Sequence, residues 1–193
     1  NAKVKSGSAT TDVPTITGGN SLSFSTSLTT PGDYYEFTVD VVNGGDIDAR
    51  LKLTLEVIKE VRDRCGNDFI IDVRISGDEY QDGGNNLTDM LYVAKQLEKA
   101  GIDMLHVSGG TTIARGSSIP APGTKLGTHS ASSEAIKKVV SIPVLSVGRI
   151  TEAWFAEEMI ATNKCDAVLM GRAVLCDPEF ANKAFEGRID DIR

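Results

Sequence analysis

From Gly45 to Arg193 the sequence alternates regularly between helical segments and short segments that are apolar throughout. A strand that is apolar on both faces is typical of a parallel sheet covered by helices, because neither face meets water. The pattern predicts strands over residues 69–75, 104–107, 144–147 and 167–170. It predicts a helix that runs from Leu51 past Val61 and ends at a cap on Gly66. Further helices are predicted over residues 87–100, 133–140, 151–162 and 179–185, with a short helix near Ala173.

These segments make four successive strand-helix units, and right-handed crossovers are expected between parallel strands. Four units are half of the eight in a (β/α)8 barrel. The alternative is an open four-stranded sheet in a small doubly wound domain. The chemistry of the loops favours the barrel. The predicted fold class is therefore α/β, the C-terminal half of a (β/α)8 TIM barrel, called the half barrel below.

Residues 1–44 differ in composition, being rich in Ser, Thr and Gly and poor in Lys and Arg. Apolar and polar residues alternate over 36–41, which predicts a half-buried strand. The turn residues Pro31-Gly32-Asp33 separate it from an earlier apolar pair, Leu22 and Phe24. This arrangement predicts a β-hairpin or meander. The chain thus divides into a β-rich leader, 1–44, and a partial barrel, 45–193.

Two predicted strands end in the same motif, a glycine followed by an arginine: Gly148-Arg149 and Gly171-Arg172. Glycine lets backbone N–H groups point at an anion, and the start of the next helix adds the positive end of its dipole. Arginine supplies a fork that fits phosphate oxygens. Because barrels of this kind bind phosphate in the loops after the last two strands, the motifs predict a phosphate site. The alternative is that both arginines cap the rim of the sheet.

Other strand-end residues are further candidates for ligand contacts. Arg74 would need an anion or an electron-rich ring at the barrel mouth, unless it pairs with Asp78 or Glu79 at the rim. Gly109 lies in a Gly-Gly turn that a ligand can approach closely. His106 is predicted to be a hydrogen-bonded strand histidine.

The long loop over residues 111–132 is of the kind that covers a ligand, and it would hold His129 over the active-site face. Tyr80 and Trp154 are predicted to be packing residues. The spacing yields no Ser-His-Asp or Cys-His arrangement, so the catalytic residues stay unassigned.

The charge and the cysteines exclude several classes of partner. A net charge of -7 without a basic stripe argues against nucleic acid. Three cysteines without C-x-x-C spacing indicate neither a disulfide framework nor a metal site. No apolar run reaches the length of a membrane span, so a soluble protein is expected.

Four motifs together carry a family resemblance: Val73-Arg74-Ile75-Ser76-Gly77-Asp78-Glu79, His106-Val107-Ser108-Gly109-Gly110, Val147-Gly148-Arg149-Ile150 and Met170-Gly171-Arg172-Ala173. In this order they closely resemble the old yellow enzyme family, nearest to its bacterial 2,4-dienoyl-CoA reductase and enoate reductase branch. The resemblance covers nearly all of residues 45–193.

The resemblance implies an FMN-binding barrel that passes hydride from NAD(P)H through the flavin to the C=C bond of a small enone or enoyl substrate. It implies that Arg74 contacts the N1/O2 edge of the flavin ring. The residues implied to hold the cofactor are Arg74 and Gly109, with Gly148, Arg149, Gly171 and Arg172 at the phosphate.

The resemblance also implies what this chain lacks. Family members carry a substrate-orienting histidine pair and a tyrosine proton donor in the first half of the barrel. Members of the branch continue into a cysteine-rich segment that binds an iron-sulfur cluster. We therefore expect a piece of a longer protein, with such a cluster only in the longer parent chain. A half barrel also leaves two strand edges unpaired, so self-association is expected.

Residues 14–50 carry a second resemblance, to the secreted β-sandwich of camelysin and biofilm-fibre proteins. A leader of secreted type joined to a cytoplasmic barrel indicates a chimera. One alternative function is therefore a non-enzymatic secreted or matrix protein with a passive half barrel. Another is a related phosphate-binding barrel, such as an isomerase or a different flavin dehydrogenase.

Overall fold

The structure is a computed structural model that describes residues 15–17, 21–23, 47–112 and 118–193, with side chains from Arg50 onwards. The chain forms two compact units, Asn1–Gly45 and Asp46–Arg193. In the first, β1 (Thr15–Thr17) and β2 (Ser21–Ser23) pair antiparallel. The strand predicted over 36–41, and the turn before it, lie outside the described residues.

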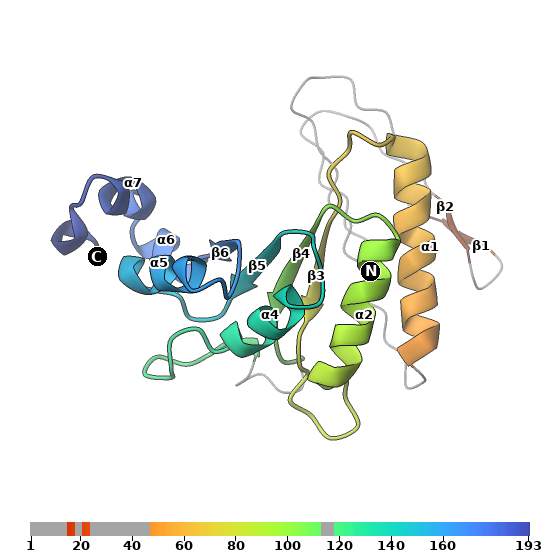
Figure 1. Cartoon of the computed structure of the whole chain (residues 1–193), viewed down its shortest axis with the longest axis horizontal. Coiled ribbons are helices and arrows are strands. Elements are labelled where there is room, and N and C mark those ends of the chain that lie inside the picture. The colour runs from red at the N-terminus through yellow and green to blue at the C-terminus, as the bar shows by residue number, and fades with distance from the viewer. Residues whose placement is uncertain (1–14, 18–20, 24–46, 113–117) are drawn as a thin grey trace. The chain divides into compact units, whose positions relative to one another are not determined.

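In the second unit, α1 (Ile47–Cys65) leads into a parallel sheet with the strand order β3-β4-β5-β6 (Figure 1). The strands are β3 (Asp72–Ser76), β4 (Met104–Ser108), β5 (Val144–Val147) and β6 (Ala167–Leu169). The helices that follow β3, β4 and β5 are α2 (Leu87–Lys99), α4 (Ser130–Lys137) and α5 (Ala153–Ala161). After β6 come α6 (Arg172–Cys176), α7 (Phe180–Phe185) and the 3-10 helix η1 (Ile189–Asp191). The predicted α/β class with four strand-helix units is confirmed.

Helix α2 begins at a reciprocal cap that its sequence dictates. The Asn86 side chain accepts hydrogen bonds from the N–H groups of Thr88 and Asp89, at 2.8 and 3.3 Å. The Asp89 carboxylate in turn accepts the N–H of Asn86 at 3.0 Å. Gly101, with φ +86°, follows the end of the helix, where a left-handed residue is commonly glycine.

Helix α4 is displaced by three residues from the helix predicted over 133–140. It begins at Ser130, because the carbonyl of His129 accepts hydrogen bonds from Ser132 and Ser133, at 3.1 and 3.2 Å. Serine is a weak helix former, so the sequence pattern favours a loop for residues 130–132. The predicted boundaries are therefore wrong.

At the amino-terminal edge of the sheet, Arg62 of α1 joins β3 to β4. Its guanidinium bonds the carbonyl of Phe69 at 2.6 Å and pairs with Asp103, just before β4, at 2.8 Å. The Asp103 carboxylate also accepts the N–H of Ile71 at 2.7 Å. Because these bonds hold the chain up to Ile71 outside the β3 strand, β3 begins at Asp72, three residues later than predicted.

The same arrangement recurs between β5 and β6. Lys137 of α4 pairs with Asp166, just before β6, and the Asp166 carboxylate accepts the N–H of Val144 at 2.8 Å. In both cases the helix before the first strand supplies the cation, and the residue before the second strand supplies the carboxylate. The half barrel therefore contains one α-β-α-β module twice.

The two faces of the sheet differ in burial. Residues on the helix-covered face are buried, among them Leu105, Val107 and Val144, and they join the main core with residues of α1, α2 and α4. Side chains alternate along a strand, so the intervening residues point to the opposite, half-exposed face. The strand register puts four of these in one row: Arg74, His106, Leu145 and Ala167.

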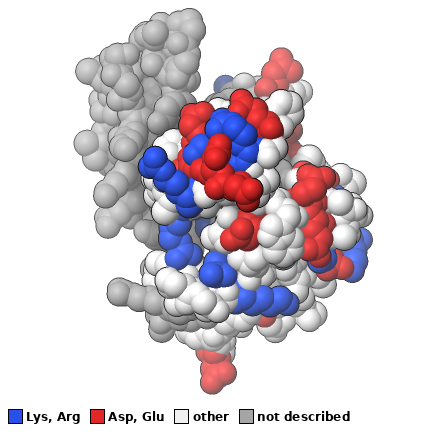
Figure 2. Space-filling model, turned by 90° about the vertical axis from the view of Figure 1, so that its left-hand side faces the viewer, with Lys and Arg blue, Asp and Glu red and all other residues white. Residues whose placement is uncertain are grey.

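The C-terminal helices are tied together by Asp177, which follows α6 and is buried. Its carboxylate accepts hydrogen bonds from the Lys183 ammonium at 2.7 Å and from the N–H of Arg193 at 3.1 Å. These bonds hold the pKa of Asp177 below its ordinary value. The face in Figure 2 shows basic and acidic side chains interleaved. After α7, Arg188 pairs with Glu186.

Candidate functional site

The carboxyl ends of the four parallel strands lie along one edge of the sheet, called the carboxyl edge below. Val147 and Leu169 are register partners at the ends of β5 and β6. The two glycine-arginine motifs, Gly148-Arg149 and Gly171-Arg172, therefore follow neighbouring strands at the same edge. Gly109 follows β4 at this edge as well.

Arg74 lies on the half-exposed face of the sheet, beside His106 on β4. Its guanidinium makes no ion pair with any described residue. The acidic residues considered as partners bond elsewhere: Asp78 accepts the N–H of Tyr80, and Glu79 accepts the N–H of Asn85, each at 2.7 Å. The rim-pair alternative for Arg74 is therefore wrong, and its charge is available to a ligand on this face.

The His106 ring is neutral at pH 7. Burial, and to a smaller extent the charge of Arg74, lower its pKa to about 4. Its Nε2 atom is buried without a hydrogen-bond partner in the described part of the chain. The expectation of a hydrogen-bonded strand histidine is therefore wrong at Nε2, because the neighbouring row residues offer a cation and apolar groups in place of an acceptor.

His129 is 2% exposed and lies between the ends of β4 and β5, so it does not cover the mouth as predicted. A Cβ at Gly148 would stand 2.9 Å from the ring Cδ2, and one at Gly109 would collide with both His129 and Tyr80. Tyr80 stacks on the His129 ring with centroids 5.9 Å apart. The absence of a side chain at Gly109 thus makes room for the packing of His129 and Tyr80.

The motif after β5 turns sharply. Gly148 has φ +139° and Arg149 has φ +46°, a region that costs a non-glycine residue energy. The Arg149 Nη1 donates to the carbonyl of Thr124 at 2.6 Å. Helix α5 begins only at Ala153, so the helix start expected directly after this motif is displaced from it.

The motif after β6 is open. A Cβ at Gly171 would meet nothing within 4 Å, and Arg172 is exposed at the start of α6. The Arg172 side chain makes no hydrogen bond or ion pair with the residues that the structure describes. An anion at the carboxyl edge can therefore reach Arg172, together with the guanidinium nitrogens of Arg149 that do not bond Thr124. These residues fit a phosphate group.

The model of the NADH:flavin oxidoreductase / NADH oxidase family matches residues 38–191. The chain belongs to this family. The resemblance to old yellow enzymes is thereby confirmed at the level of the family. The match begins seven residues before Gly45, within the segment predicted to be the leader.

Relatives within the family include the NADH oxidase of Thermoanaerobacter brockii, 41% identical over 150 residues, which cover 78% of this chain and 23% of that protein. The cinnamate reductase of Clostridium sporogenes is 30% identical over 164 residues, which cover 78% of this chain and 25% of that protein. This chain therefore spans about a quarter of the length of these relatives.

Solved structures agree with the family assignment. A 2-naphthoyl-CoA reductase complex has a TM-score of 0.72 at 26% identity, over 77% of this chain and 23% of that one. The old yellow enzyme homologue from Zymomonas mobilis has a TM-score of 0.54 at 22% identity, over 75% of this chain and 39% of that one, and it shares the fold. The predicted half of a TIM barrel is confirmed.

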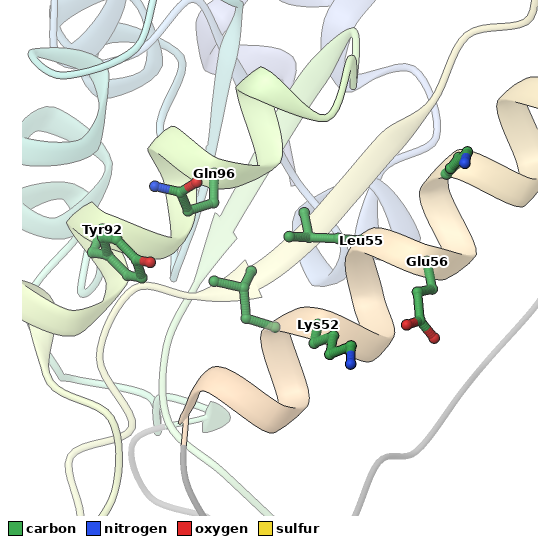
Figure 3. Close-up of a pocket in the computed structure, with 7 residues that line it drawn as sticks. Lys52, Leu55, Glu56, Tyr92 and Gln96 are labelled. Carbon is green, nitrogen blue, oxygen red and sulfur yellow. The ribbon is translucent and has the colours of Figure 1, made fainter. Parts of the chain in front are cut away.

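A second surface feature contains none of the predicted site residues. A groove of about 370 Å³ lies between α1 and α2 (Figure 3), lined by Leu51, Lys52, Leu55, Glu56, Lys59, Tyr92 and Gln96. Within the described ranges, no three His, Cys, Asp or Glu residues converge as metal ligands, and no helix has the length and apolarity to cross a membrane.

No sequence pattern indicates the contact between Arg149 and Thr124. The acceptor is a backbone carbonyl, and 25 residues separate it from Arg149. The packing of the His129 ring beside Gly109 and Gly148 is equally hard to predict, because it arises only where two loops meet.

Proposed function

We propose that the carboxyl edge binds FMN and that the chain supplies this half of the site of a flavin-dependent reductase. The observation that carries the proposal is that Gly148-Arg149 and Gly171-Arg172 follow adjacent parallel strands, in a chain of the NADH:flavin oxidoreductase family. When bound, FMN would supply hydride transfer from NAD(P)H to an electron-poor C=C bond.

In this proposal Arg149 and Arg172 hold the phosphate group of FMN, with backbone N–H groups at Gly148 and Gly171. Arg74 contacts the N1/O2 edge of the flavin ring, where its charge favours the anionic reduced form. The missing ion pair at Arg74 supports this role, because a neutralised guanidinium would stabilise that form less.

The substrate we propose is an enone or enoyl compound, as in the 2,4-dienoyl-CoA and enoate reductase branch. Relatives named cinnamate reductase and 2-naphthoyl-CoA reductase support this class. We place the proton donor and the substrate-orienting residues in a first half of the barrel, and any iron-sulfur cluster in a longer parent chain. A cytoplasmic location suits this chemistry.

Flavin binding tests the proposal. The purified chain is titrated into FMN, and quenching of the flavin fluorescence gives a dissociation constant. Arg149→Ala and Arg172→Ala should each weaken binding by about tenfold, because each removes a charge-assisted contact. Arg64→Ala, on α1, is the matched control and should bind as the parent does.

Absence of quenching and of yellow colour after incubation with FMN would refute the proposal for this chain. That outcome would favour the alternative of a non-enzymatic secreted or matrix protein, which rests on the resemblance of residues 14–50. Uptake of a different cofactor, identified after extraction, would instead indicate another phosphate-binding barrel.

A further inference from the structure

The segment 121–128, between β4 and α4, lies directly on the motif after β5. The Thr128 N–H donates to the carbonyl of Gly148 at 3.1 Å. The carbonyl of Thr124 accepts the Arg149 Nη1 at 2.6 Å. The segment therefore contacts both residues of the motif for which a phosphate is proposed.

Bonds within the segment fix the position of the Thr124 carbonyl. The N–H and the hydroxyl of Thr124 both bond the carbonyl of Ala121, at 3.2 and 2.8 Å. The Thr128 hydroxyl bonds the carbonyl of Lys125 at 3.1 Å. Gly127, with φ +62°, lies against the ring of Phe155 so closely that a Cβ would stand 2.6 Å from it. The acceptor for Arg149 is thus part of a turn that its own hydrogen bonds close and that packs against Phe155 at its Gly127 end.

We propose that segment 121–128 is the positioning element of the anion site. Its Thr124 carbonyl holds the Arg149 guanidinium at the carboxyl edge, and an anion on Arg149 in turn holds the segment in place. A guanidinium has five N–H donors in a rigid fork, so one nitrogen can bond a carbonyl while the others bond an anion. The inference rests on the proposed function, because it assumes that the anion is the phosphate of FMN.

Coupling of this kind is reciprocal: if the ordered segment favours anion binding, the anion favours the ordered segment by the same factor. The opposite sign would follow if the anion needed Nη1 itself, because binding would then break the Thr124 contact and release the segment. The two cases differ in whether FMN protects the segment or exposes it.

Limited proteolysis measures this sign. Lys125 is exposed, so trypsin can cleave after it, and mass spectrometry can follow that one cleavage. Saturating FMN should slow it by about fivefold or more, and inorganic phosphate should slow it in the same direction. Cleavage after Lys164, in the turn between α5 and β6, is the internal reference and should not change.

Unchanged or faster cleavage after Lys125, while fluorescence shows FMN bound, would overturn this inference and leave the proposed function standing. Lack of FMN binding would overturn both.

Two matched variants separate positioning from charge. Arg149→Lys keeps the charge but loses the fork, so FMN binding should weaken and protection after Lys125 should be lost even at saturating FMN. Arg172→Lys should weaken binding and leave that protection intact, because no described contact joins Arg172 to the segment. Protection retained in Arg149→Lys would show that the segment does not act through this arginine.

Discussion

The glycines at the carboxyl edge differ in their surroundings, although sequence analysis predicts a ligand contact for each of them. His129 packs against Gly109 and Gly148, so protein atoms fill the space that a side chain would take at these positions. Gly171 faces open space with an ordinary negative φ of -87°. Of these three glycines, Gly171 is the one whose missing side chain leaves open space.

This difference predicts unequal effects of the same substitution. Gly148→Ala should lower the free energy of unfolding by about 1–3 kcal/mol, because the new methyl group meets the His129 ring at a backbone φ of +139°. Gly171→Ala should change it by less than about 0.5 kcal/mol. Urea unfolding followed by circular dichroism measures both. Equal effects in the two variants would contradict the steric account.

The buried Nε2 of His106 predicts a variant that is more stable than the parent. His106→Leu should gain about 1 kcal/mol at pH 7, since no unsatisfied nitrogen remains. The folded-state pKa of about 4 lies below the unfolded value of 6.5, so the unfolded chain binds the proton more readily between these values. The parent therefore loses stability as the pH falls through this window.

The variant lacks this loss, so its advantage should widen at pH 4.5 by about 1 kcal/mol. That is less than the full pKa difference implies, because solvent screens a partly buried ring. Urea midpoints at both pH values measure the change, and titration of the carboxylates is common to both proteins. An advantage that stays constant with pH would show that His106 is not the titrating group.

At the scale of helices and strands, periodicity predicted the order and type of the elements because apolar spacing reflects the buried face. It failed where contacts distant in sequence decide a boundary. Strand β3 begins late because Asp103, 32 residues away, takes the N–H of Ile71. The adjacency of the two glycine-arginine motifs was predictable, since consecutive parallel strands end at one edge. The packing of His129 was not, because it depends on how two loops meet.

The junction at Arg62 should carry more stability than its place on a helix surface suggests. Arg62→Met should lower the free energy of unfolding by about 2–3 kcal/mol, because its guanidinium bonds four carbonyls and the Asp103 carboxylate. Arg64→Met, two residues along α1, alters an exposed pair with Glu60 and should cost less than about 0.5 kcal/mol. Denaturant titration distinguishes them. A loss in Arg64→Met as large as that in Arg62→Met would rule out a special role for Arg62.

At the scale of the molecule, β3 and β6 are the edge strands of the four-stranded sheet that the structure describes. Among the described strands, β3 pairs only with β4 and β6 only with β5. Large apolar side chains are exposed beyond β6, where Leu175 is 83% and Phe185 is 94% exposed. Full barrels close such edges by pairing the first strand with the last. The same backbone groups can pair with another chain here.

We therefore expect the chain to self-associate through these edges. Light scattering after size exclusion should give masses above the 20.6 kDa of one chain, rising with concentration. The double substitution Leu175→Glu with Phe185→Glu should shift the distribution toward the monomer, because charge at these exposed positions opposes apolar contact. Tyr92→Glu on α2 is the control, since it adds one such charge at an exposed position away from the strand edges. A single monomeric species that unfolds cooperatively at every concentration would show that the edges are closed within one chain.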